Sequence, residues 1–151
     1  MNWIRFIKSA RRGSAMLEFA VGAGVLVSVF TGTFQFGYTF YQYNKLSNAV
    51  NAGARYASLR AYNSPNATPA SNFNTAVKNM VVYGNPAGTG SPVVPGLAPG
   101  NVVLTPTFTL AVPSHMTVEI QGFTLNSVVS STRLNHKPKV TYPYLGLYMP
   151  F

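Results

Sequence analysis

Residues 11–19 read Arg-Arg-Gly-Ser-Ala-Met-Leu-Glu-Phe and place one carboxylate directly after a cluster of positive charge. The four basic residues before Gly13 are Arg5, Lys8, Arg11 and Arg12. After Glu18 the chain has no Asp, Glu, Lys, Arg or His until Lys45. An uncharged and mostly apolar run of this length predicts a membrane-spanning helix over about residues 19–43.

Glu18 is the residue of this segment that most opposes membrane insertion, because placing a carboxylate at mid-membrane costs roughly 2.5 to 3.5 kcal/mol on insertion scales. A partner arises if the chain is cut between Gly13 and Ser14, since Ser14 then carries a free amine that is mostly protonated at neutral pH. An ammonium and a carboxylate about 4 Å apart attract by roughly 4 kcal/mol at an effective dielectric constant of ~20. We therefore expect Glu18 to pair with this amine, either within one helix or in a neighbouring subunit.

This pattern resembles the cleavage region of type IV prepilins, which have a basic leader, a Gly, four uncharged residues, a Glu, an aromatic residue and an apolar helix. Residues 48–57, Asn-Ala-Val-Asn-Ala-Gly-Ala-Arg-Tyr-Ala, follow Phe36, Gly37, Tyr38 and Tyr41. Together with the closing Val-Thr-Tyr-Pro-Tyr of residues 140–144, they resemble the TadE-like minor pilins, or pseudopilins, of the tight-adherence (Tad) pilus. Two positions depart from the pattern: Ala52 stands where the family often has an acid, and Phe19 stands where the major pilins usually have Tyr.

The resemblance implies a structural minor pilin that supports pilus biogenesis and surface adhesion. A prepilin peptidase would remove the leader, residues 1–13, and Glu18 would serve in assembly with other pilin subunits on an inner-membrane assembly platform. The leading basic residues favour a cytoplasmic N-terminus, so the chain would cross the bacterial inner membrane once with its C-terminus in the periplasm. After assembly the protein would lie in the pilus at the cell surface.

Two other classes of protein fit the same segment. A signal anchor that is never cut would leave a membrane-anchored module. An ordinary secretory signal with an apolar region over residues 19–30 would release a soluble, β-rich protein. That signal has no Ala-x-Ala-like cleavage site after it, and the nearest pair of small residues is Thr31 and Thr33.

Proline divides the 151 residues into two parts, because all eleven prolines lie at or after Pro65. A helix over residues 14–62 would be roughly 73 Å long at ~1.5 Å per residue, so its second half must leave a ~30 Å hydrocarbon core. That half is amphipathic, with an apolar stripe that requires cover. Residues 63–151 are long enough for one small periplasmic or extracellular domain, and the absence of cysteine excludes disulfides within it.

Small residues repeat every four positions along the predicted helix, in two rows. The first row is Ala20, Gly24, Ser28 and Gly32, and the second is Ala49, Gly53 and Ala57. Residues at this spacing share one face, where they allow a second helix to approach closely. We expect both rows to serve in helix packing.

The segment after Pro65 predicts an α+β fold in which the long helix packs on a small antiparallel sheet. Apolar spacing predicts a short helix from Phe73 to Val81, capped by Ser71 or Asn72 and stopped by Gly84. Residues 85–100 are expected to form an exposed loop. Strands are expected at residues 102–104, 107–112, 116–124 and 139–144, and the stripe of the long helix is expected to lie under this sheet.

Catalytic and metal-binding patterns are missing from the sequence. Glu18 and Glu119 are the only acids, and His115 and His136 lack metal-ligand spacing, so we expect no enzyme, no cofactor and no metal. One basic cluster suggests a polyanion site in an anchored module. Its members are Arg133, His136, Lys137 and Lys139. A solvated turn between strands is the preferred explanation of this cluster, and we do not expect nucleic acid as its ligand.

Overall fold

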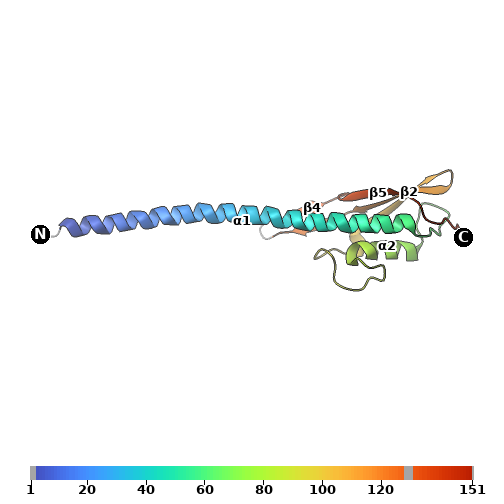
Figure 1. Cartoon of the computed structure of the whole chain (residues 1–151), viewed down its shortest axis with the longest axis horizontal. Helices are drawn as coiled ribbons and strands as arrows, with labels where there is room; N and C mark the ends of the chain where they lie inside the picture. Colours follow the sequence, from blue (N-terminus) through green and yellow to red (C-terminus); the bar gives the residue numbers. More distant parts are fainter. Residues whose placement is uncertain (1–2, 128–130, 151) are drawn as a thin grey trace. The chain divides into compact units, whose positions relative to one another are not determined.

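Helix α1, Trp3–Leu59, carries the chain from its N-terminal region into the folded domain in this computed structural model (Figure 1). The structure describes residues 3–127 and 131–150, with side chains described from Gly13 onward. Its contacts divide the chain into two compact units, Met1–Tyr38 and Thr39–Phe151. The helix passes through Gly13 without a break, because one glycine costs about 1 kcal/mol relative to Ala and no proline follows until Pro65.

The end of α1 lies at Leu59, earlier than the end near Tyr62 that the sequence predicted. Contacts from the C-terminal part of the chain explain this difference. Leu145 donates its backbone N–H to the carbonyl of Ser58 at 2.9 Å, and Tyr62 forms a parallel bridge with Tyr148. The backbone after Leu59 therefore satisfies its polar groups with a distant segment instead of another helical turn.

Helix α2, Ser71–Tyr83, confirms the predicted short helix and its stop. Gly84 is in the left-handed conformation with φ 70°, and it donates its N–H to the carbonyl of Met80. The predicted cap is wrong, because Ala70 occupies the N-cap position and no side chain caps the helix. Asn72 instead accepts the N–H of Phe73 at 2.8 Å.

Residues 85–98 form a loop, as expected, and the loop ends in one short turn of 3-10 helix, η1, Pro99–Asn101. The loop is not exposed throughout, because Val94 and Leu97 are buried in the core. Strand β1, Val102–Thr109, follows it directly. The two strands predicted at residues 102–104 and 107–112 are thus one strand with Pro106 inside it. The order β1-β2-β5 makes β1 an edge strand of its sheet, where a residue without an N–H is tolerated.

The β1-β2-β5 sheet is antiparallel throughout, and two further strands form a separate, smaller antiparallel sheet. Strand β2, Val112–Ile120, pairs with β1 and with β5, Lys139–Pro143, while β3, Phe123–Asn126, pairs with β4, Ser131–Leu134. The strand predicted at residues 116–124 begins earlier and ends at Ile120, because Gly122 with φ 64° turns the chain into β3. Strand β4 was not predicted, and β5 lies close to its predicted position.

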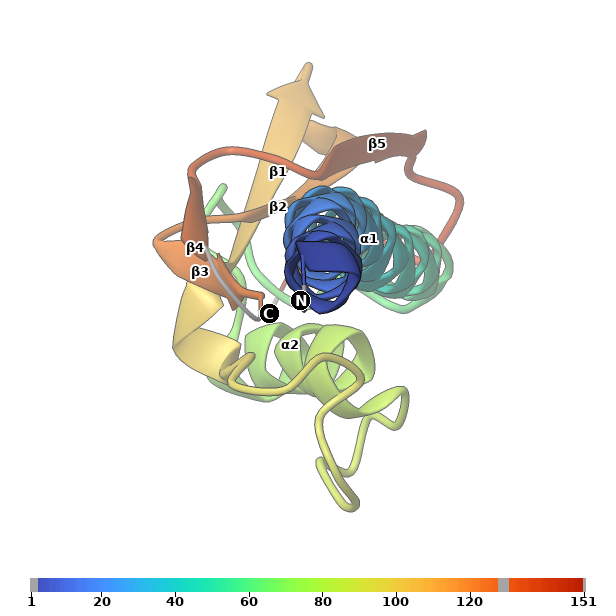
Figure 2. The same cartoon turned by 90° about the vertical axis from the view of Figure 1, so that its left-hand side faces the viewer.

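The core of the second unit gathers around the final turns of α1, which Figures 1 and 2 show between α2 on one side and the β1-β2-β5 sheet on the other. Its largest fully buried side chains come from every layer. They include Leu46 and Val50 of α1, Val77, Val81 and Val82 of α2, and Val102, Met116, Val118 and Ile120 of β1 and β2. The fold class is therefore the predicted one, α+β with a long N-terminal helix on a small antiparallel sheet.

The sheet was predicted to cover the apolar stripe on the second half of α1, and the structure differs from this prediction in one respect. A Cβ built on Gly53 would collide with the side chain of Val81, so α2 and not only the sheet covers this part of α1. Gly53 is buried, and its missing side chain is what allows the two helices to approach.

Candidate functional site

The candidate assembly segment is the part of α1 from Gly13 to Gly32. Every residue from Gly13 to Gly22 is exposed within the chain, including Ser14 and Glu18. Ser14 and Glu18 are four positions apart in a helix, so they lie on one face about one turn from each other. This spacing allows the amine of a chain that begins at Ser14 to reach the Glu18 carboxylate within one helix or across to a neighbouring one.

The first row of small residues is open to any partner. Ala20, Gly24, Ser28 and Gly32 are all exposed, and a Cβ added at Gly24 or Gly32 would meet no atom within 4 Å. Ser28 donates its hydroxyl to the carbonyl of Gly24 at 2.8 Å, so this polar group is satisfied inside the helix. A second helix that packs against this row would contact only backbone and small side chains, so the two helices could approach closely.

Large apolar side chains cover the other faces of the same segment. Phe19 is 78% exposed, Leu26 is 72% exposed and Phe30 is 71% exposed. Helix α1 between Gly13 and Leu59 is long and apolar enough to cross a membrane; its most apolar stretch has a mean hydropathy of 1.7, and none of it is buried inside the protein. Apolar surface of this extent requires lipid or other helices around it.

The second row of small residues has a different environment. Ala49, Gly53 and Ala57 are buried inside the second unit, in the same core as α2 and the sheet. The close approach that Gly53 permits is made to Val81 of the same chain. This row therefore packs the domain together, whereas the row that begins at Ala20 is uncovered.

Two members of the basic cluster predicted from the sequence, His136 and Lys139, contact Glu119. His136 Nδ1 lies 2.8 Å from Glu119 Oε1, and Lys139 Nζ lies 3.5 Å from Glu119 Oε2. The hydrogen bond from His136 is the main cause that holds the pKa of Glu119 below its usual range. Antiparallel pairing of β2 with β5 sets Glu119 opposite Lys139, and this register could not be read from the sequence.

The other two members of the cluster are exposed. Arg133 lies on β4 opposite Thr124, and Lys137 precedes Pro138 through a cis peptide bond. All four members of the cluster are thus exposed, and two of them, His136 and Lys139, have a Glu119 carboxylate oxygen within 4 Å. In the described residues, no group of three His, Cys, Asp or Glu side chains is placed to hold a metal ion.

Tyr62 and Tyr144, which the sequence did not single out as site residues, join the end of α1 to the C-terminal segment, residues 144–149, here called the C-terminal clasp. Tyr62 is fully buried, and its N–H is directed at both the Tyr144 hydroxyl, 2.8 Å away, and the Leu147 carbonyl, 2.9 Å away. The Tyr144 hydroxyl in turn has two acceptors within reach, the Leu147 carbonyl at 2.8 Å and the Arg60 carbonyl at 2.9 Å. Burial raises the pKa of both tyrosines.

Gly146 fits this clasp for a steric reason. A Cβ on Gly146 would collide with the carbonyl oxygen of Arg60. The Tyr62 ring also packs edge to face against Phe73, Phe108 and Tyr144 and stacks on Tyr148. The clasp therefore determines where α1 ends and holds the C-terminal segment against the end of this helix. The sequence analysis did not predict this role; residues 140–144, which carry part of the family resemblance, overlap the clasp only at Tyr144.

Comparison with known proteins supports the resemblance over the helix. Residues 13–55 match the family model of TadE-like proteins, a match that begins at Gly13 and ends inside the packed half of α1. A search of curated proteins and a search of solved structures each found no match. The match covers less than a third of the 151 residues. Over residues 13–55, within α1, the chain is therefore similar to TadE-like proteins.

Proposed function

We propose that this TadE-like chain is a structural minor pilin of a Tad-type pilus, cut after Gly13 and assembled through the first part of α1. The observation that carries the proposal is the location of the family match on the candidate assembly segment. In that segment the apolar side chains and the row from Ala20 to Gly32 are uncovered, while the comparable row at Gly53 is used inside the domain.

Each feature of the segment has a role in this proposal. The apolar side chains hold α1 in the inner membrane before assembly and pack against neighbouring helices afterwards. The row of small residues allows those helices to approach closely. Glu18 pairs with the Ser14 amine of a neighbouring subunit, which offsets the cost of placing a carboxylate among apolar groups and fixes the stagger between subunits. The implied partners are a prepilin peptidase, an inner-membrane assembly platform and other pilins.

Replacement of Glu18 in piliated cells tests the pairing role. Glu18→Gln removes the charge at constant size, so the chain should still be cut and inserted but should co-purify poorly with other pilins. Glu18→Asp keeps the charge on a shorter side chain and should retain part of the incorporation. Wild-type co-purification of Glu18→Gln would remove the carboxylate from the assembly mechanism.

An anchored module with a polyanion site is the alternative function. It requires a free basic face, and the position of Glu119 between His136 and Lys139 reduces the charge available there. No observation on the described residues favours it over the pilin role.

A further inference from the structure

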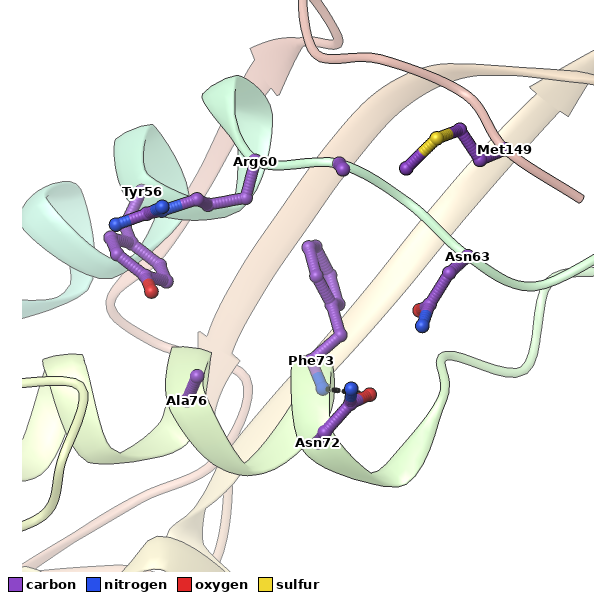
Figure 3. A pocket seen from close by; sticks show the side chains of 8 residues that line it. Tyr56, Arg60, Asn63, Asn72, Phe73, Ala76 and Met149 are labelled. Carbon is purple, nitrogen blue, oxygen red and sulfur yellow. Dashed lines mark hydrogen bonds between the residues drawn. The ribbon is translucent and has the colours of Figure 1, made fainter.

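A pocket of about 350 Å³ opens between the end of α1, the following backbone and the first turns of α2, wholly within the second unit. Its lining combines apolar and polar residues: Tyr56, Arg60, Ala61, Asn63, Asn72, Phe73, Ala76 and Met149. Figure 3 shows the Phe73 ring between Arg60 on one side and Asn63 and Met149 on the other. The volume lies at the lower end of the range for small-molecule sites, about 300 to 1,000 Å³.

Arg60 provides a positioned cation at this pocket. Its guanidinium lies 4.9 Å from the centre of the Tyr56 ring in a cation–π contact. Figure 3 shows this side chain extended toward Tyr56, at the side of the pocket away from Asn63 and Asn72, so its N–H donors are available at the pocket rim. The sequence contains only two acidic side chains, and neither Glu18 nor Glu119 lines the pocket. An arginine in this setting is suited to bind a carboxylate of a ligand through two parallel hydrogen bonds.

The two asparagines add groups that suit hydroxyls. Asn72 uses its Oδ1 to accept the N–H of Phe73 at 2.8 Å, which leaves its Nδ2 as a donor. Asn63 offers both a donor and an acceptor. The Phe73 ring, the Met149 side chain and two alanines supply apolar surface between these polar groups.

We propose that this pocket binds an acidic sugar, a hexuronate ring with a carboxylate, several hydroxyls and an apolar ring face. The carboxylate binds Arg60, the hydroxyls bind Asn63 and Asn72, and the C–H face of the ring lies on Phe73 and Met149. This site is separate from the basic cluster around Glu119. It does not depend on the proposed pilin role, because binding is a property of the second unit whether or not the chain assembles.

The test uses the full chain in detergent micelles and follows the Met149 methyl and the Asn63 and Asn72 side-chain amides by NMR. Methyl glucuronide should shift these signals in a saturable way at millimolar concentration. Methyl glucoside, which lacks only the carboxylate, should bind roughly tenfold to a hundredfold more weakly, since hydrogen bonds to a charged group contribute that much. Equal binding of the two sugars, or glucuronide shifts confined to residues outside the pocket, would overturn the proposal.

Three variants separate this site from general charge attraction. Arg60→Met keeps an unbranched apolar stem and should lose the preference for glucuronide, whereas Arg55→Met, at an exposed arginine of the same helix outside the pocket, should keep it. Asn72→Asp can still accept the Phe73 N–H but adds a negative charge, so it should weaken glucuronide binding and spare glucoside binding. The proposal is wrong if Arg55→Met and Arg60→Met lose the same affinity, or if inorganic phosphate or N-acetylglutamate binds the pocket as tightly as the glucuronide.

Discussion

Gly53→Ala is the substitution whose effect the structure determines most closely. The added Cβ meets the Val81 side chain at a distance that real Cβ atoms do not show, so α1 and α2 must separate or Val81 must change its rotamer. Overpacking of this kind costs about 1 to 3 kcal/mol. The change from Gly to Ala inside a helix returns about 1 kcal/mol, so the free energy of unfolding should fall by up to ~2 kcal/mol.

Thermal or denaturant unfolding of the full chain in detergent, followed by tyrosine fluorescence, measures this effect. A loss of 1 kcal/mol corresponds to a fall in Tm of about 4 to 8 °C for a domain of this size. Gly24→Ala is the matched control, because its Cβ would meet nothing within 4 Å and should leave the Tm of the domain unchanged.

A double-mutant cycle with Val81→Ala identifies the contact itself. Val81→Ala removes the methyl groups that the new Cβ meets, so the double variant should be less destabilised than the sum of the two single variants. A Gly53→Ala variant as stable as the wild type, or additive effects in the cycle, would refute the packing of Gly53 on Val81.

Four further predictions concern charge, the clasp and the open row. The pKa of Glu119 is lowered in the folded state, so the charged carboxylate stabilises the fold above its ordinary pKa near 4.5, and this stabilisation is lost as the pH falls through the folded-state pKa. Glu119→Gln should therefore lower the Tm at pH 7. The difference in Tm between the variant and the wild type should shrink below about pH 4. Tyr144→Phe should cost about 1 to 2 kcal/mol in urea unfolding, because the Arg60 and Leu147 carbonyls lose the hydroxyl donor that they share and the Tyr62 N–H loses one acceptor; an unchanged midpoint would contradict the clasp. The folded-state pKa values of Tyr62 and Tyr144 are raised, so stability should be full below about pH 10 and fall as the pH rises through the folded values, which an alkaline titration would detect. Gly24→Leu should insert normally but co-purify poorly with other pilins, while normal co-purification would exclude close helix approach at the open row.

The spacing of apolar residues and the positions of proline and glycine explain which parts of the fold could be predicted from the sequence. The absence of proline before Pro65 indicated α1, and apolar spacing with Gly84 indicated α2. Strand boundaries were less accurate, because Pro106 suggested a break that an edge strand tolerates. Strand β4 lies within an exposed and polar stretch, Ser131–Leu134, that has no alternating pattern to reveal it.

The candidate sites also fall into those that local sequence predicted and those that depend on contacts between distant residues. Gly13, Ser14, Glu18 and the first row of small residues depend on spacing along one helix, so local sequence was sufficient to place them on a common segment. The pairs between Glu119 and Lys139, between Gly53 and Val81, and between Tyr62 and Tyr144 join residues far apart in the chain. Such contacts depend on strand register and helix docking, which a single sequence does not specify.

The intact mass of the protein purified from piliated cells tests the central claim most directly. The account predicts a chain that begins at Ser14 and has lost residues 1–13, and Gly13 replaced by a bulky residue should leave the precursor uncut. A mature mass that retains Met1 would instead indicate an uncleaved membrane anchor, and a loss of about thirty residues near Thr33 would indicate a secreted protein. Either of these two masses would contradict assembly through the Ser14 amine and Glu18.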